Sequence, residues 1–505
     1  MECGGKAGAA TPLAGGREFT DLRKCFVRAK AAWRFASRRS PRWALAVLDF
    51  LKTMTMKIKT TVFCLTVSAL AVIFSARAGD TNSTGWLTRP LSLTDALNTA
   101  LLQNTSILKA KNDLEASHGL VVQTRAVALP QITAAGQYKA TDPKFVEKFG
   151  AFDQPDQNWN AGVQISQSIY LGGRMVASIR AAGATKQQAL AIYRTAVADA
   201  LLQVRLAYYD VLLAEQQVSV REASVKLLEK ERADQQHRFD AGTVPHFNVL
   251  RAEVSVANER PPLIAARNAL RISKNNLANL MGYDLPRDVW EDIPLNLTDS
   301  LATAPWDIKL PDAIQQALTR RTELVALKKA VDLQKLNIVN AKSGYKPSVD
   351  VFAGYGWHNA TFTPPVELDH DIRGWNVGAQ LNWSIFDGAL TYGKVLSAKA
   401  LYEKSRTELT DGSRQIELGV RTVYSEFMQA RETLESQGKV QEMADESLRE
   451  ARARTEAGTG TQLDVLNAET ALTQARTTQV QAQHDYLTAR AKLERAIAID
   501  LVPVK

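Results

Sequence analysis

Cysteine is scarce in this chain of 505 residues: there are three, at positions 3, 25 and 64. Because no cysteine follows residue 64, the rest of the chain can form neither a disulfide nor a thiolate metal site. A chain free of cysteine suits an oxidising compartment. After Phe74 there is also no apolar run of the roughly 20 residues that a membrane-spanning helix requires. The six histidines lack metal-ligand spacing, and no phosphate-binding glycine loop or nucleophile motif follows residue 78. The sequence thus predicts no cofactor, no metal site and no enzyme.

The first 78 residues differ from the rest in charge. They carry 14 Lys and Arg against 4 Asp and Glu, whereas the remainder carries 48 against 49, so the basic pI comes from this leader and does not indicate nucleic-acid binding. A basic segment, a short apolar run and the small-x-small site Ala76-Arg77-Ala78 predict a signal peptide at 56–78. We interpret residues 1–55 as an upstream extension that is not part of the protein; the alternative is a basic cytoplasmic arm.

Proline is absent from residues 174–241, which read as one very long helix. Valines recur there at intervals of seven residues: Val197, Val204, Val211, Val218 and Val225. A repeat of seven keeps one seam facing a neighbour only when helices supercoil, so the pattern predicts coiled-coil packing. A helix of this length would extend about 100 Å and would need partners along all of it.

The chain repeats itself at a nearly fixed offset of 216 or 217 residues. Leu93-Thr-Asp-Ala-Leu matches Leu310-Pro-Asp-Ala-Ile, and Trp159-Asn-Ala-Gly-Val-Gln-Ile matches Trp375-Asn-Val-Gly-Ala-Gln-Leu. Arg238-Phe-Asp-Ala-Gly-Thr likewise matches Arg454-Thr-Glu-Ala-Gly-Thr. A fixed period indicates a duplicated unit. We therefore predict a first repeat at 79–282, a linker at 283–309 and a second repeat at 310–505.

Each repeat has the same order of parts. The first predicts a helix at 94–129, strands at 131–138 and 159–170, the long helix, and a returning helix at 247–281. The two shorter helices, stacked end to end, match the span of the long one and would give it a partner throughout. Pro261-Pro262 predicts a kink or short break in the returning helix.

Aromatic residues gather in or near the ends of the predicted strands. The members that predict an aromatic girdle are Tyr138, Trp159, Tyr170, Trp375, Trp383 and Phe386. Together with alternation such as Val163 and Ile165 against Gln164 and Ser166, they favour a membrane barrel; a soluble sandwich core is the alternative. Four strands cannot close a barrel, so a membrane location requires strands from several chains.

These features together resemble the TolC-like outer-membrane efflux proteins. The resemblance covers about Leu91 to Ile499, and it is most specific in residues 375–389 and in the stretch from Arg454 to Glu469, each with a counterpart in the first half. It implies a mainly α fold with β structure, made of two tandem repeats that each carry long coiled-coil helices and a two-strand hairpin. It also implies a homotrimer with a 12-strand outer-membrane β-barrel above a periplasmic α-helical tunnel.

The resemblance implies a passive exit duct for small toxic molecules or secreted proteins, in a tripartite efflux or type I secretion system. The expected partners are a periplasmic adaptor (membrane fusion) protein, an inner-membrane pump of the RND, ABC or MFS type, and outer-membrane lipid, with no nucleic acid. The expected location is the outer membrane, extending into the periplasm. A periplasmic coiled-coil adaptor without pore activity is the alternative, although it leaves the aromatic-flanked strands without a role. A general porin would need far more strand.

In this family the helix turns at the periplasmic end close the tunnel and receive the adaptor. The corresponding tip residues are Ala241, Gly242, Thr243, Ala457, Gly458 and Thr459. We predict that Gly242 and Gly458 cap helix ends and that Asn248 and Asp464 cap the next helix starts. His237 and His246 flank one turn, and we interpret them as solvated tip residues rather than metal ligands.

The same residues predict the periplasmic gate. Asp464, Asn467 and Asn248 are the expected pore constriction, with Asp464 forming a ring of three carboxylates in a trimer. The sequence departs from the TolC pattern here, because Asn467 replaces a second acid, Gly460 replaces an arginine and Thr455 replaces a tyrosine. The resemblance therefore does not imply the prototype's closed latch.

Overall fold

The computed structural model describes residues 90–142, 157–283, 293–362 and 368–499. The chain divides into two compact units, residues 1–83 and 84–505, and the described residues belong to the second. The predicted extension and signal peptide lie outside them. The elements, in chain order, are α3 (Leu93–Gln103), α4 (Thr105–Ala126), β1 (Gln131–Ala140), β2 (Gln157–Leu171), α5 (Arg174–Asp240), α6 (His246–Met281), α7 (Leu310–Arg320), α8 (Thr322–Lys342), η2 (Ser343–Tyr345), β3 (Ser348–Phe362), β4 (Leu368–Asn382), α9 (Leu390–Glu456) and α10 (Gln462–Ala496).

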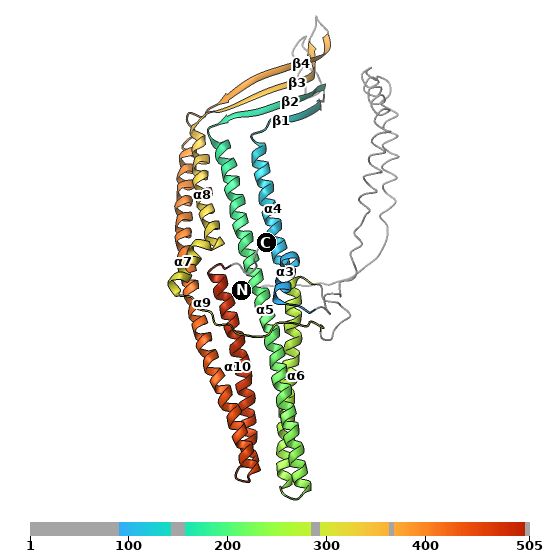
Figure 1. Ribbon diagram of the computed structural model, residues 1–505. Coiled ribbons are helices and arrows are strands. Elements are labelled where there is room, and N and C mark those ends of the chain that lie inside the picture. Colours follow the sequence, from blue (N-terminus) through green and yellow to red (C-terminus); the bar gives the residue numbers. More distant parts are fainter. Residues whose placement is uncertain (1–89, 143–156, 284–292, 363–367, 500–505) are drawn as a thin grey trace, which may run out of the picture. The chain divides into compact units, whose positions relative to one another are not determined.

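Two unbroken helices of 67 residues, α5 and α9, form the scaffold of this unit. Along α5, α4 and α3 pack on the part nearer the sheet and α6 packs on the remainder (Figure 1). Along α9, α8 and α7 take the first position and α10 takes the second (Figure 1). The prediction that two shorter helices stack end to end against one long helix is confirmed.

The leading helix predicted at 94–129 is in fact two helices that meet at Asn104. This residue has an extended backbone (ψ 125°), and its Oδ1 accepts hydrogen bonds from the amides of Ser106 and Ile107 at 2.8 and 3.2 Å. Its Nδ2 donates to the Leu280 carbonyl at 2.6 Å. By capping the start of α4, Asn104 ends α3. The apolar pattern runs through both helices and therefore did not predict the break. The second repeat breaks likewise, between α7 and α8, at Arg321 (ψ 126°).

Pro261 and Pro262 lie inside α6 without ending it, so the predicted short break is wrong. The two prolines remove two internal hydrogen-bond donors, which costs helix stability. Ion pairs with α5 lie on both sides of them: Arg221 donates to Glu259 at 2.9 Å before the prolines, and Arg267 donates to Glu222 at 2.7 Å after them. Packing on α5 therefore maintains the helix where its own hydrogen bonds are missing.

A ladder of ion pairs fixes the register of α5 against α6. Successive pairs are seven residues apart on both helices, as coiled-coil packing requires. The pairs are Glu215–Lys274, Glu222–Arg267 and Glu229–Arg260. The pair Asp445–Arg476 joins α9 to α10 at 2.8 Å, and its positions lie 216 residues after Glu229 and Arg260. The two repeats thus share one helical register.

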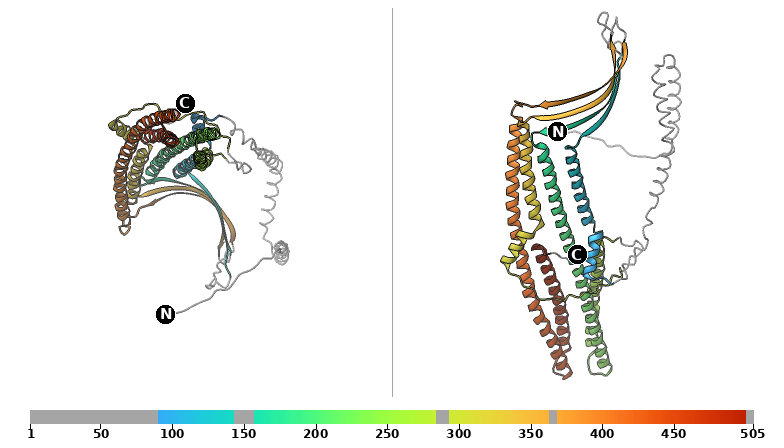
Figure 2. Two further views of the ribbon diagram at one scale, coloured as in Figure 1. Left: turned by 90° about the horizontal axis from the view of Figure 1, so that it is seen from below. Right: turned by 45° about the horizontal axis from the view of Figure 1, so that its top comes forward.

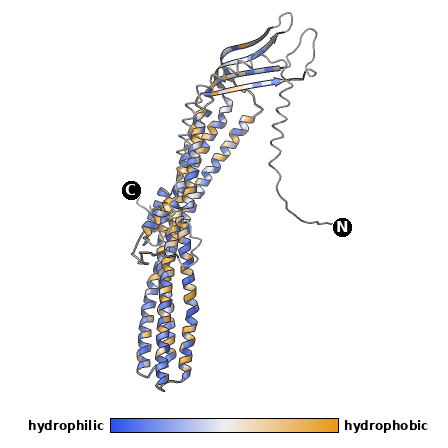
Figure 3. Ribbon diagram, turned by 90° about the vertical axis from the view of Figure 1, so that its right-hand side faces the viewer, coloured by the Kyte–Doolittle hydropathy of each residue, from blue (hydrophilic) through white to orange (hydrophobic). Residues whose placement is uncertain are grey.

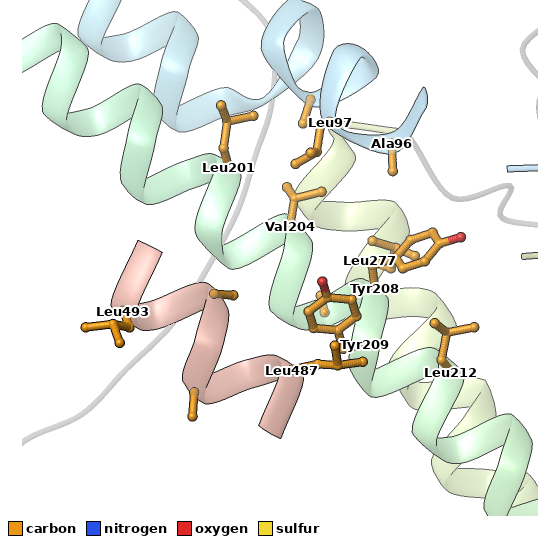
Figure 4. Close-up of a cluster of buried hydrophobic side chains, with 14 of the residues drawn as sticks. Ala96, Leu97, Leu201, Val204, Tyr208, Tyr209, Leu212, Leu277, Leu487 and Leu493 are labelled. Carbon is orange, nitrogen blue, oxygen red and sulfur yellow. The ribbon is translucent and has the colours of Figure 1, made fainter. Parts of the chain in front are cut away.

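The main hydrophobic core surrounds the middle of α5. Val204, Tyr208 and Val211 are fully buried there, among side chains from α3, α6 and α10 (Figure 4). Burial of each such side chain stabilises the fold by about 1.5–3 kcal/mol. Away from the core, apolar and polar residues alternate along the helices (Figure 3).

The linker crosses this core without forming a helix over residues 293–309. The Tyr208 hydroxyl donates to Asp299 Oδ2 at 2.8 Å, and the Leu93 amide donates to the same oxygen at 2.8 Å. A single bridge also pairs Leu91 with Leu297. Asp299 therefore ties the linker to the start of α3 and to α5.

The four strands form one curved antiparallel sheet in the order β1-β2-β3-β4 (Figure 2). Gly172 (φ 63°) and Gly173 (φ 91°) turn β2 into α5. A Cβ on Gly172 would lie 2.7 Å from the Ser343 carbonyl oxygen, so this turn requires glycine. Gly388 (φ 65°) and Ala389 (φ 69°) make the corresponding turn from β4 into α9.

Among the helices that the structure describes, none combines the length and the apolar composition of a membrane-spanning helix.

Candidate functional site

The strand register places apolar side chains on one face of the sheet. Residues directly opposite one another share a face, so the register assigns the paired strand positions to one face or the other. Two adjacent rows on this face are Ile132, Ile165, Ala353 and Val377, then Ala134, Val163, Tyr355 and Trp375. Ile132 is 70% exposed and Val377 is 68% exposed in the single chain. An apolar surface of this extent requires cover by lipid or protein.

The opposite face is polar. One of its rows contains Thr133, Gln164, Gly354 and Asn376, and another contains Gln137, Asn160 and His358. Apart from a bulge in β2 between Ser168 and Tyr170, the two faces alternate along the strands, the pattern of a sheet that lies between an apolar and an aqueous environment.

Two of the six predicted girdle residues, Tyr138 and Trp159, lie toward the end of the sheet remote from the helices, whereas Trp375 lies in the middle of β4. Tyr138 is directly opposite Trp159, and Trp375 is opposite Tyr355. The Tyr355 ring packs edge-to-face on Trp357 with centroids 5.0 Å apart. Tyr138 and Trp159 thus mark the remote end, and Tyr355, Trp357 and Trp375 lie nearer the middle of the sheet.

The other three lie at the helical end. Trp383 donates its indole N–H to the Tyr345 carbonyl at 3.2 Å, and Phe386 is 86% exposed. Tyr170 is paired with Val349 at the same end of the sheet. Eight residues of strand between Trp375 and Trp383 extend about 26 Å, close to the height of an apolar membrane band once strand tilt is allowed for.

The two turns between long and returning helices have the same C-terminal cap. Gly242 (φ 74°) and Gly458 (φ 78°) occupy the left-handed conformation that the sequence predicted. The amide of Thr243 donates to the Arg238 carbonyl, and the amide of Thr459 to the Arg454 carbonyl, each at 2.9 Å. Ala241 and Ala457 are the capping residues that precede the glycines.

The starts of the returning helices differ. Thr461 is the N-cap of α10: Oγ1 accepts from the Asp464 amide at 3.2 Å, and Asp464 Oδ2 accepts from the Thr461 amide at 2.9 Å. Asp464 therefore completes a capping box rather than serving as the cap itself. At the start of α6 the N-cap is Pro245, which makes no side-chain cap, and Asn248 donates its own amide to the Pro245 carbonyl. The predicted capping role of Asn248 is wrong.

Hydrogen bonds from Thr461 hold the pKa of the Asp464 carboxyl below its usual value, and the charge of Arg454 adds a smaller effect. This carboxylate is solvent-exposed and therefore ionised at neutral pH. Asp464 and Asn467 line one groove of about 430 Å³ between α9 and α10, together with Glu450 and Arg454. The structure thus brings two of the three predicted gate residues together on one surface.

Asn248 belongs to the other hairpin. Its carbonyl accepts a hydrogen bond from Gln462 Nε2 at 3.1 Å, which joins the two tips within one chain. Gln462 was not among the predicted site residues, although its place at the start of α10 next to Thr461 could have drawn attention to it. The contact uses the backbone of Asn248, so its side chain is not required for it.

Sequence reasoning also missed Glu469, which is 2% exposed. Burial raises the pKa of its carboxyl, and a hydrogen bond from Arg452 at 2.9 Å opposes that shift. The corresponding Glu253 is exposed. The repeat pattern contained both glutamates but could not tell which one is buried.

His237 and His246 take no part in a polar cluster at the first tip. The His246 ring packs on Phe239 with centroids 5.2 Å apart. Within the described ranges there is no group of three His, Cys, Asp or Glu side chains arranged to hold a metal ion.

Comparison with known proteins agrees with this geometry. The sequence profile of the outer membrane efflux protein family matches residues 96–283 and 313–498. The chain is 22% identical to outer membrane protein TolC of Vibrio cholerae over 85% of this chain and 94% of that protein. It is 25% identical to the alkaline protease secretion protein AprF of Pseudomonas aeruginosa over 60% and 62% of the two chains. The solved structure of VceC from Vibrio cholerae superposes with a TM-score of 0.66 at 18% identity, over 80% of this chain and 95% of that one.

The family profile covers both repeats and nearly all the described elements. This match favours the exit duct over the adaptor without pore activity. The chain belongs to the outer membrane efflux protein family and is an outer-membrane exit channel, for efflux or type I secretion, that extends into the periplasm.

Proposed function

We propose that three copies of this chain assemble into one duct, with a 12-strand barrel in the outer membrane and a helical tunnel in the periplasm. The observation that supports this most strongly is the two-faced sheet. Among the described strands, the outer edges of β1 and β4 have no partner. Unpaired edges of 10 and 15 residues invite pairing with another chain, and pairing β4 of one copy with β1 of the next closes a barrel. The number three follows from the family resemblance.

Exposed apolar side chains on the helices support the same assembly. On α6 they are Phe247, Leu250, Val254, Ile264 and Ile272, and on α9 they include Leu396, Leu401, Leu418 and Met443. Phe247, Leu250 and Val254 are spaced to share one face of α6, and an exposed apolar stripe of this kind is typical of a subunit interface. Adjacent copies would cover them in the tunnel wall.

In this proposal the duct receives cargo from a periplasmic adaptor and an inner-membrane pump. The turns Ala241–Thr243 and Ala457–Thr459 are the expected adaptor contacts, because they are the exposed tips of the two hairpins. Relatives include a protease secretion protein, AprF, and the cobalt-zinc-cadmium resistance protein CzcC of Cupriavidus metallidurans. The cargo is accordingly a small toxic solute or a secreted protein, selected by the pump. The domain boundaries at 78, 282 and 309 remain part of the proposal.

The gate in this proposal is the Asp464 surface. Three copies would place three exposed, ionised carboxylates around one axis, with Asn467 beside each. Such a ring attracts cations and narrows the passage.

The experiment is native mass spectrometry of the detergent-purified protein, followed by single-channel recording from the same sample. We expect a mass of three chains and discrete conductance steps. A monomer or dimer that is folded by circular dichroism would contradict the trimer. A trimer without conductance would contradict the pore.

A further inference from the structure

The polar face of the sheet carries no Asp, Glu, Lys or Arg over four successive rows. The register gives these rows as Gln131, Ser166, Phe352 and Gly378; Thr133, Gln164, Gly354 and Asn376; Ala135, Gly162, Gly356 and Gly374; and Gln137, Asn160, His358 and Ile372. Four rows at two residues per step extend about 20 Å along the strands. The polar side chains are five carboxamides, the hydroxyls of Thr133 and Ser166, and the imidazole of His358. No Asp, Glu, Lys or Arg stands in these rows.

Charged residues stand just beyond both ends of this stretch. Lys139 lies one row past Gln137, and Asp350 lies one row before Phe352. The Asp350 carboxylate accepts a hydrogen bond from Ser168 Oγ at 2.6 Å, which ties it to the neighbouring strand. The neutrality is therefore confined to the central rows.

The third row is made of three glycines and Ala135. Gly162 and Gly356 are direct partners, as are Gly356 and Gly374. If this face lines the inside of a barrel, a row without longer side chains leaves the barrel interior wider at this level than at the rows on either side. The adjoining rows contain Gln164 and Asn376, or Asn160 and Gln137, whose amides project beyond the backbone.

We propose that, in the assembled duct, this face lines a charge-neutral passage with hydrogen-bonding walls. The passage does not distinguish cations from anions. The proposal rests on the proposed function, because it takes the polar face as the lumen of a closed barrel. Hydrated solutes of either sign then meet the same amide surface, and its widest level is the glycine row. Discrimination by charge belongs to the periplasmic tips, where Asp464 is exposed.

The chain offers a direct test because its three cysteines all precede residue 65. Single-cysteine variants Gln164→Cys and Ala135→Cys would be reconstituted in liposomes and treated with membrane-impermeant methanethiosulfonates, one cationic and one anionic. Each rate is divided by the rate of the same reagent with a free thiol in solution. We expect the two normalised rates to agree within about threefold, since no ring of charged side chains surrounds the introduced thiol.

Three controls make the result decisive. The protein without an introduced cysteine gives the background. Adding Asn376→Asp to Gln164→Cys should favour the cationic reagent by more than threefold, because Asn376 and Gln164 flank Gly354 in one row. Val163→Cys, on the apolar face next to Gln164, should react much more slowly with both reagents.

The outcomes separate the two proposals. Normalised rates that differ by more than about threefold at Gln164→Cys and Ala135→Cys overturn the neutral passage while leaving the barrel intact. Equal accessibility of Val163→Cys and Gln164→Cys shows instead that neither face meets lipid, which contradicts the barrel in the proposed function.

Discussion

The returning helices α6 and α10 occupy equivalent places in the two repeats, yet their surroundings differ. The buried side chains of α6 are few and apolar, whereas α10 buries residues along its whole length. Its buried polar members include Glu469, His484, Glu494 and Arg495. The difference arises because α10 packs against both α9 and α5, while α6 packs mainly against α5 (Figure 1).

The comparison shows that an internal repeat determines local register without determining burial. Both hairpins have the same glycine turn, and the ion pair Glu229–Arg260 has its counterpart in Asp445–Arg476. What differs is the number of neighbours, which depends on the order in which the helices lie side by side. α6 lies at an edge and presents apolar side chains, so in the proposed assembly it is the helix that would contact a second copy.

The largest expected effect concerns Arg495, which bridges α10 to α5 and α8. Its Nε donates to Asp199 at 2.9 Å and its Nη2 donates to Glu323 at 2.8 Å. We expect Arg495→Met to destabilise the protein by about 3 kcal/mol, because it removes the nearest cation from Asp199 and from Glu323 and leaves only Arg321, 3.9 Å from Glu323. The equivalent residue in the first repeat, Asn279, is exposed, and Asn279→Ala should change stability by less than about 0.5 kcal/mol. Thermal unfolding in detergent measures both, and equal losses would contradict the contrast between the helices.

Leu466 and Leu250 form the second matched pair. Leu466 is 7% exposed and packs with Leu228 and Val256, whereas Leu250 is 47% exposed in the single chain. Leu466→Ala should cost about 2–4 kcal/mol at any protein concentration, because it opens a cavity within one chain. If another copy covers α6, Leu250→Ala should destabilise only the assembly and become more harmful on dilution. Denaturant unfolding over a hundredfold range of concentration distinguishes the two; a Leu250→Ala effect independent of concentration would argue against an interface on α6.

The third prediction concerns His484, whose two ring nitrogens both face carboxylates. Nε2 lies 2.9 Å from Asp210 of α5, and Nδ1 lies 3.0 Å from Asp485. Both contacts are hydrogen bonds only when both nitrogens carry protons. Burial lowers the pKa of His484, but the hydrogen bonds and charges of Asp210 and Asp485 outweigh burial and raise it overall.

A raised pKa means that the stabilisation is complete below the ordinary histidine pKa of about 6.5 and is lost as pH rises through the higher folded value. We expect His484→Asn, which installs the residue type of the equivalent Asn268, to cost about 1–3 kcal/mol at pH 5.5. The deficit should shrink at alkaline pH. Melting temperatures of both proteins from pH 5 to 9 test this, and a deficit that grows with pH would show that the imidazole is neutral when folded.

Much of the architecture could be predicted from particular residues. The valine repeat and the lack of proline predicted α5 to within one residue, and Gly242 and Gly458 predicted the caps that the structure shows. The break at Asn104 was missed because a capping asparagine is hidden in an apolar pattern that continues on both sides. Pro261 and Pro262 were judged by local propensity, whereas packing on α5 decided the outcome.

The candidate site was less accessible to such reasoning. The spacing Thr461-x-x-Asp464 is that of a capping box and can be recognised in the sequence. The resemblance to the family, however, singled out Asp464 without Thr461. Burial of Glu469 and the contact from Gln462 to Asn248 depend on how the two hairpins lie together, which no local pattern encodes. The gate, tip and girdle residues remain predictions.

The smallest expected effect separates two roles of Asp464 at the tip. Thr461→Ala removes the N-cap but leaves the carboxylate, and should destabilise α10 by about 1 kcal/mol. Asp464→Ala removes one arm of the capping box together with the charge. If the ring of carboxylates controls the passage, Asp464→Ala should lower the preference for potassium over chloride in single-channel recordings, whereas Thr461→Ala should leave it unchanged. Equal effects of the two substitutions would show that Asp464 acts only by ordering the start of α10. Asn248→Ala is the matched change at the other tip: because its side chain caps nothing, it should leave stability unchanged, and its effect on selectivity tests whether Asn248 belongs to the constriction.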